Sequence, residues 1–187
     1  MKTLVIDACT SDRSRTRKLT RYLCEKLDKD MEIIRLNEQK PYSFDMALLE
    51  KRDAAIAKAD FSDDMFKAAK QFANAENIIV AAPYWDLSFP AVLKQYIESI
   101  NVCGLTFGYS ENGMPVSMSN AKRLIYITTA GGYIVSDEFG FGYIKKVMEL
   151  FYGVKRFDYI KAEGLDIIGA DIDAILEKAK EDIDRIF

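Results

Sequence analysis

Short apolar runs rich in β-branched residues recur along the chain and alternate with segments of helical spacing. The runs at residues 3–8, 31–36, 77–83, 123–129 and 157–162 predict five strands. Because most of them are apolar almost throughout, they are typical of strands in a parallel sheet that is buried on both faces. The pattern therefore predicts an α/β fold with helices above and below one sheet.

The segments between these runs carry apolar residues at helical spacing and predict the covering helices. Residues 41–60 start irregularly and then become helical, residues 105–119 read as a loop rich in Gly, Asn and Pro, and Ser62 and Pro90 mark two helix starts. The remaining helices are expected at residues 15–27, 62–75, 89–102, 143–151 and 171–187. In such folds ligands bind beyond the carboxyl ends of the strands, so the loops after the first, third and fourth strands are the candidate site.

Composition narrows the function. The 187 residues fit one domain, and 49% of them are hydrophobic. The net charge of −3 makes nucleic acid an unexpected partner, because nucleic-acid-binding domains usually carry a basic surface. No apolar run is long enough for a membrane span, the first residues do not resemble a signal peptide, and the three cysteines read as reduced thiols of a cytoplasmic protein. Histidine is absent, so we expect a cofactor to carry any chemistry.

The first loop, residues 9–16, offers hydroxyls at the start of a helix, where free N–H groups and the helix dipole favour an anion. Thr10, Ser14, Arg15 and Thr16 are its candidate phosphate contacts, and no dinucleotide or P-loop glycine motif is present. Plain helix capping by the hydroxyls is the alternative, with the basic residues at 13–18 forming a solvated face.

The second and third loops suit a flat ligand. The second, residues 82–90, holds the chain's single tryptophan among further large apolar groups, although core packing of Trp85 is an equal alternative. The third, residues 128–133, contains paired glycines, which let a backbone approach a ligand closely but also suit an ordinary turn. The three loops together match the outline of FMN.

Four segments resemble the flavodoxin-like NAD(P)H:quinone reductase and FMN-dependent azoreductase family: APYWDLSFPAVLKQYIE, the flap-like TFGYSENGMP, ITTAGG and KAEGLDIIG. The resemblance covers nearly the whole chain. It implies a single domain over residues 1–187, a three-layer sandwich with strand order 2-1-3-4-5, and FMN reduced by NADH or NADPH. It also implies hydride transfer through flavin N5 to a quinone, azo or nitroaromatic acceptor.

Carried over onto this chain, the resemblance assigns cofactor contacts and a homodimer whose second subunit helps to wall the acceptor pocket. Phe107 and Phe151 are the candidates for that wall, and Tyr84, Tyr109 and Tyr133 are candidate proton donors. Besides the first loop, the implied cofactor-binding residues are Pro83, Tyr84, Trp85, Asp86, Leu87, Thr129, Ala130, Gly131 and Gly132.

Three features depart from the family pattern. Asp86 stands where azoreductases usually have Asn, and Ala130 where some relatives have Arg. The first loop is short, with a cysteine and a threonine where serines are frequent. A carboxylate near the flavin would oppose the negative charge of its reduced form unless it turns to solvent or caps the next helix. A flavodoxin-like electron carrier and a non-catalytic FMN-binding protein are the alternative functions. The segment at residues 105–119 resembles a substrate flap and favours the enzyme.

Overall fold

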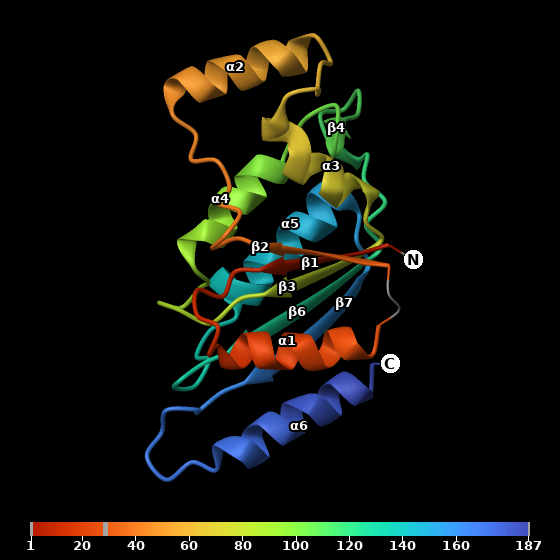
Figure 1. Cartoon of the computed structure of the whole chain (residues 1–187). Helices are drawn as coiled ribbons and strands as arrows, with labels where there is room; N and C mark the ends of the chain where they lie inside the picture. Colours follow the sequence, from red (N-terminus) through yellow and green to blue (C-terminus); the bar gives the residue numbers. More distant parts are fainter. Residues whose placement is uncertain (1, 28–29, 187) are drawn as a thin grey trace.

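Five parallel strands form the centre of the molecule. In the computed structural model, which describes residues 2–27 and 30–186, the sheet runs in the order β2-β1-β3-β6-β7 (Figure 1). Its strands are β1 (Thr3–Asp7), β2 (Met31–Arg35), β3 (Asn77–Ala81), β6 (Arg123–Thr129) and β7 (Arg156–Ala162). This order corresponds to the expected 2-1-3-4-5, so the sequence-based prediction of the fold is confirmed.

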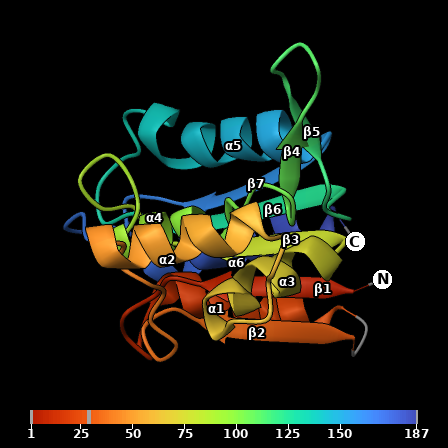
Figure 2. The same cartoon turned by 90° about the horizontal axis from the view of Figure 1, so that it is seen from above.

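Helices cover both faces of the sheet, as the two views show (Figures 1 and 2). One face carries α1 (Arg15–Glu25) and α6 (Ile172–Asp184) over a core that includes Val5, Ile79 and Ile125. The other face carries α3 (Lys67–Asn74), α4 (Ala91–Ile100) and α5 (Tyr143–Tyr152), and α5 follows a π-helical turn, η2 (Glu138–Gly142). Alternate strand residues such as Leu4, Ile78 and Leu124 point into this second core. The inner strands β1, β3 and β6 are therefore apolar on both sides, which explains their continuous apolar runs in the sequence.

Helix ends differ from the sequence-based prediction in local detail. Ser62 is not a helix cap: the Asp63 carboxylate caps a 3₁₀ turn, η1 (Asp64–Phe66), by accepting from the Met65 N–H at 2.9 Å. A charged carboxylate accepts a main-chain hydrogen bond more strongly than a hydroxyl does, which explains why Asp63 caps this turn and Ser62 does not. Pro90 precedes α4 as its N-cap instead of lying in its first turn. The last predicted helical residue, 187, lies outside the described residues.

The predicted loop at residues 105–119 contains a hairpin instead. Strands β4 (Phe107–Tyr109) and β5 (Pro115–Ser117) pair antiparallel, and β5 lies against α5. The turn is closed by the Ser110 N–H, which donates to the Met114 carbonyl at 2.8 Å, and Gly113 has a φ of 73°. Strands of three residues are too short to show an alternating pattern of apolar and polar residues, so the sequence predicted only the turn.

Helix α2 (Met46–Ala57) lies apart from the layers, at the top of Figure 1. None of its residues is fully buried; Leu48, Ala55 and Ile56 pack partly against a small cluster around Phe66. Among residues 2–27 and 30–186, no helix is long and apolar enough to cross a membrane.

Candidate functional site

The first, second and third loops meet at the carboxyl edge of β1, β3 and β6, which are neighbours in the sheet. Between them lies a hollow of about 400 Å³. Its lining combines residues of all three loops with one residue that follows β7: Thr10, Ser11, Arg13, Ser14, Arg15, Pro83, Tyr84, Trp85, Thr129, Gly131 and Asp166. The structure thus brings together eight of the residues expected to bind the cofactor.

The first loop presents hydrogen-bond donors to the hollow. Ser14 is the N-cap of α1; its hydroxyl oxygen accepts from the Arg17 N–H at 3.3 Å, and its own proton can donate to the nearby Cys9 sulfur or to a ligand. The N–H groups of Arg15 and Thr16 have no acceptor within the part of the chain that the structure describes. Free N–H groups at a helix start, beside the exposed Arg13, favour an anion such as a phosphate.

A buried ion pair braces this loop from behind. The Arg17 guanidinium donates through Nε to Asp7 at 2.6 Å, through one terminal nitrogen to Asp12 at 2.6 Å and through the other to the Cys9 carbonyl at 2.7 Å. Asp7 also accepts from the Cys9 N–H at 2.8 Å. Burial, with the Asp7 charge nearby, raises the pKa of the Cys9 thiol to about 12, so this cysteine stays protonated and is no nucleophile.

Thr16 does not line the hollow. Its side chain is fully buried, and its Oγ1 lies 2.7 Å from the Oγ1 of Thr129 in a hydrogen bond between α1 and β6. The bond joins the first loop to the third. Any contact of Thr16 with a ligand in the hollow would therefore come from its main-chain N–H.

The second loop turns sharply at Asp86 and Leu87. Trp85 and Ser88 exchange two main-chain hydrogen bonds of 3.1 and 2.7 Å across them. Both central residues have positive φ, 49° for Asp86 and 67° for Leu87, a combination typical of a two-residue hairpin turn and costly for a side chain such as leucine. The turn leaves Trp85 47% exposed at the hollow, so core packing of this residue is excluded.

Bonds from its side chains also anchor the second loop. The Tyr84 hydroxyl donates to the Ser136 carbonyl at 3.2 Å, and the Ser88 hydroxyl donates to the Phe139 carbonyl at 2.6 Å. The Tyr84 N–H donates to the Thr129 carbonyl at 3.0 Å. The loop is thus tied to the chain between β6 and α5.

The third loop meets an acidic residue that the sequence did not single out. Asp166 donates its N–H to the Gly131 carbonyl at 2.8 Å, and a Cβ on Gly131 would lie 2.1 Å from Asp166 Oδ2. A side chain at position 131 would therefore displace the Asp166 side chain, whereas a Cβ on Gly132 would meet nothing within 4 Å. Asp166 also pairs with Arg15 at 2.8 Å, and Arg15 donates to the Leu165 carbonyl at 2.8 Å.

Several predicted residues lie beside the hollow instead of lining it. Asp86 and Leu87 are exposed at the tip of the second loop, Ala130 is buried, and Gly132 is exposed. Asp86 does not cap α4, whose N-terminus receives no side-chain hydrogen bond. Tyr133 is exposed at the third loop.

The candidate acceptor-pocket residues form a separate aromatic cluster on the hairpin and α5. The Phe107 and Phe151 rings meet edge to face with centroids 5.0 Å apart, and Phe107 meets Tyr109 at 5.5 Å. Neither phenylalanine lines the hollow of its own chain.

Sequence reasoning missed Ser11, Arg13 and Asp166 as lining residues. Ser11 and Arg13 belong to the expected loop, and only their side-chain direction was unknown. Asp166 follows the strand beside β6, so a search of the loop after every neighbouring strand would have included it.

The lining fits a flat cofactor with one terminal phosphate. Hydroxyls and free N–H groups gather at one end, and an exposed indole stands at the hollow with three loops around it. Among the described residues, no group of acidic or cysteine side chains could hold a metal ion.

The chain resembles known proteins over its whole length. A family profile described as a flavodoxin-like fold matches residues 1–187. An FMN-dependent NADH:quinone oxidoreductase of Coprothermobacter proteolyticus is 31% identical, and the alignment covers 94% of this chain and 92% of that protein. One from Clostridium perfringens is 38% identical over 126 residues; the match takes in 66% of this chain and spans only 61% of that relative.

Solved structures share the architecture. An azoreductase of Bacillus anthracis superposes with a TM-score of 0.81 at 20% identity, and the match covers 100% of this chain and 98% of that one. At this identity the likeness establishes the fold alone.

Proposed function

The chain belongs to the flavodoxin-like fold family, and from this premise we propose that it is an FMN-dependent NAD(P)H oxidoreductase. The observation that carries the proposal is the hollow itself, where a donor-rich helix start and the exposed Trp85 occupy neighbouring loops. The FMN-dependent quinone oxidoreductases among its relatives support it. Bound FMN would accept a hydride at N5 from NADH or NADPH and pass it to a quinone, azo or nitroaromatic acceptor.

The first loop would hold the phosphate. Thr10 and Ser14 would donate their hydroxyl protons, and Arg15 and Thr16 would donate their free main-chain N–H groups. Arg13 adds a positive charge at the rim, and among the described residues it has no ion-pair partner. With room for one phosphate and no second basic cradle among the lining residues, the site favours FMN over FAD.

The second and third loops would hold the ring system. Pro83, Tyr84 and Trp85 supply an apolar wall, while Thr129 and Gly131 stand at the polar side with Asp166. Asp86, Leu87, Ala130 and Gly132 would contribute through main-chain groups, because their side chains do not line the hollow.

Two exposed tyrosines are candidates for donating a proton to the acceptor. The Tyr84 proton is already committed to the Ser136 carbonyl. Tyr133 and Tyr109 are exposed, and within the described residues neither hydroxyl donates a side-chain hydrogen bond, so both are available as donors.

We also propose a homodimer in which the partner's hairpin completes the acceptor pocket. Phe107 and Phe151 lie away from the hollow of their own chain, and the same hairpin and helix carry the exposed apolar side chains of Tyr109, Met114 and Leu150. Exposed aromatic and methionine side chains are typical of interface anchors. Light scattering at micromolar concentration should give a dimer, and a fully active monomer would contradict this arrangement.

The remaining assignments follow from the same function. Residues 1–187 act as one domain, supported by a family profile that matches that whole range. The free cysteines and the use of NADH or NADPH favour a cytoplasmic location.

The test begins with the absorbance spectrum of the purified protein, reconstituted with FMN where needed. Flavin bands are expected, and the cofactor released on denaturation should elute as FMN. Rapid mixing with NADH and with NADPH should bleach the bands, and a quinone should restore them. FAD in the eluate or no flavin binding overturns the proposal, and bleaching without turnover favours an electron carrier.

A further inference from the structure

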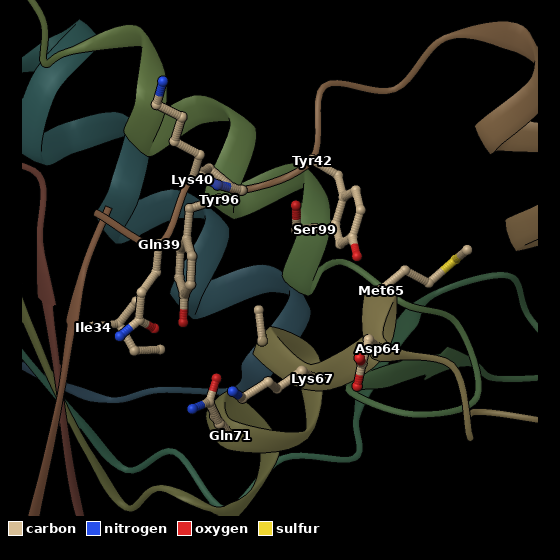
Figure 3. A pocket seen from close by; sticks show the side chains of 12 residues that line it. Ile34, Gln39, Lys40, Tyr42, Asp64, Met65, Lys67, Gln71, Tyr96 and Ser99 are labelled. Carbon is tan, nitrogen blue, oxygen red and sulfur yellow. The ribbon is translucent and has the colours of Figure 1, made fainter. Parts of the chain in front are cut away.

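A second cavity of about 320 Å³ lies between β2, α3 and α4 and the segment at residues 39–42, which we call the strap. Besides the strap, Ile34 of β2, Asp64 and Met65 of η1, Lys67, Ala68 and Gln71 of α3, and Tyr96 and Ser99 of α4 line it (Figure 3). No residue lines both this cavity and the cofactor hollow. It is therefore independent of the proposed redox function.

The cavity contains an unpartnered buried hydroxyl. Tyr96 is 1% exposed, and its hydroxyl has no hydrogen-bond partner among the described residues. The nearby Glu32 carboxylate accepts from Gln71 instead. Burial raises the pKa of Tyr96 above its usual range, so this hydroxyl stays protonated and is available as a donor. Buried polar groups without a partner are rare in proteins and indicate a missing acceptor.

Positive charge lies beside this donor. Lys67 and Lys40 form no ion pair within the described residues, and Asp64 is the only acidic residue in the described lining. Figure 3 shows the Lys67 ammonium on the same side of the cavity as the Tyr96 hydroxyl, while the end of Lys40 is directed away. One end of the cavity thus offers donors to an anionic oxygen.

The rest of the wall is mixed. Ile34 and Met65 are buried and apolar, and Ala68 is partly buried. Pro41 and Tyr42 of the strap also line the cavity, together with the polar side chains of Gln39 and Ser99. Water alone could satisfy Tyr96, but it would gain no dispersion contact with the apolar side chains.

We propose that the cavity binds a small aromatic carboxylate. The carboxylate accepts from the Tyr96 hydroxyl and the Lys67 ammonium, and the ring lies against Ile34, Met65 and Ala68. A phenol and an ammonium as donors, with apolar side chains in the same lining, favour this class over neutral aromatics and over small inorganic anions.

The test uses the full chain saturated with FMN, or the same chain without flavin if none binds. Benzoate and naphthoate are titrated while amide NMR spectra are recorded, with benzamide as the neutral control. Saturable shifts are expected at residues around the strap, α3 and α4, and they should persist with and without FMN. Failure of the redox proposal would thus leave this result intact.

Matched variants locate the contacts. Lys67→Met and Tyr96→Phe should each weaken benzoate binding roughly tenfold or more, the loss expected for a hydrogen bond to a charged group. Lys40→Met removes the same charge from an equally exposed side chain whose ammonium is directed away from the cavity, so it should change binding less than about twofold. Tyr96→Phe should leave the melting temperature unchanged or higher, because it removes an unpartnered buried hydroxyl.

Three results would overturn the proposal. The first is the absence of saturable shifts with either carboxylate, which would assign the cavity to water alone. The second is equal weakening by Lys67→Met and Lys40→Met, which would indicate general charge attraction. The third is unchanged benzoate binding in Tyr96→Phe.

Discussion

The first and second loops are both shaped in advance of any ligand, but by different means. The first loop rests on a buried side-chain network in which Arg17 holds Asp7, Asp12 and the Cys9 carbonyl. The second loop rests on its own backbone, with Asp86 and Leu87 both at positive φ inside a two-residue turn. Its most prominent side chain, Trp85, is about half exposed.

This difference predicts which substitutions would disturb each loop. The first loop depends on residues that do not face the hollow, so a substitution behind it should disturb both stability and binding. The second loop stores conformational strain at its tip, as functional sites often do. Substitutions that relieve this strain should stabilise the protein and alter only the ring side of the site.

The largest effect is expected for Arg17→Met. The substitution leaves Asp7 buried without its partner, because both side chains of this pair are at most 6% exposed. Breaking a buried pair from one side costs about 3–5 kcal/mol of unfolding free energy, which a urea titration measures. FMN binding should weaken with it, since the Cys9 carbonyl loses its donor.

Two controls keep this effect specific. Arg13→Met removes a charge from an exposed side chain of the same loop and should change stability by less than about 0.5 kcal/mol. Arg17→Met combined with Asp7→Asn should recover part of the loss, because no uncompensated charge remains. Equal losses for Arg13→Met and Arg17→Met would refute the bracing role.

The next effect concerns the donors of the first loop. Replacing both Ser14 and Thr16 with Ala should weaken FMN by about 1–3 kcal/mol, the range for hydrogen bonds to a charged group. Ser14→Ala alone should carry most of this loss and also cost about 1 kcal/mol of stability as a lost N-cap. Fluorescence titration of FMN and thermal unfolding measure the two terms.

Thr16→Val is the matched variant. It keeps the main-chain N–H but breaks the hydrogen bond to Thr129, so stability should fall while FMN affinity changes little. A large loss of FMN affinity with Thr16→Val would mean that the Thr16 hydroxyl leaves Thr129 to bind the phosphate.

The contrast also explains what the sequence could reveal. Runs such as those around Ile79 and Ile125 are apolar on both faces, so the strands, their parallel arrangement and the meeting of the three loops were predictable. The glycine at 131 was recognised as a close approach, although its neighbour is Asp166 instead of a ligand.

Polar contacts between residues far apart in the sequence could not be predicted, because they leave no local sequence pattern. Arg17 looked like part of a solvated basic face, yet its partner Asp7 lies at the end of β1 and draws it inside. The pair of Arg15 and Asp166 joins residues 151 positions apart. The positive φ values in the second loop were equally hidden, because Asp-Leu lacks the glycine that usually marks such a turn.

A smaller effect, of opposite sign, is expected at the second loop. Leu87→Gly should stabilise the protein by up to about 1 kcal/mol, because a side chain in the left-handed region costs roughly 1–2 kcal/mol and glycine loses part of that gain through its freedom in the unfolded chain. Thermal unfolding measures the gain. Leu87→Ala keeps the Cβ and should give none; a gain of the same size from alanine would show that the leucine side chain, and not the backbone, is the source of strain.

The smallest effect is expected for Asp86→Asn, which tests whether the second loop tunes charge as well as shape. The Asp86 side chain is exposed and caps no helix, so any field on a bound flavin passes through solvent. Two charges 4 Å apart in water interact by about 1 kcal/mol, which is about 20 mV for a two-electron couple, so the midpoint potential should rise by roughly 10–20 mV. Asparagine tolerates the left-handed region better than most residues, so stability should not fall.

A spectroelectrochemical titration at low and high salt tests this prediction, because a charge effect through solvent shrinks as salt is added. A shift that is insensitive to salt would mean that the substitution changed the turn, and no shift at low salt would mean that the second loop acts through its backbone alone.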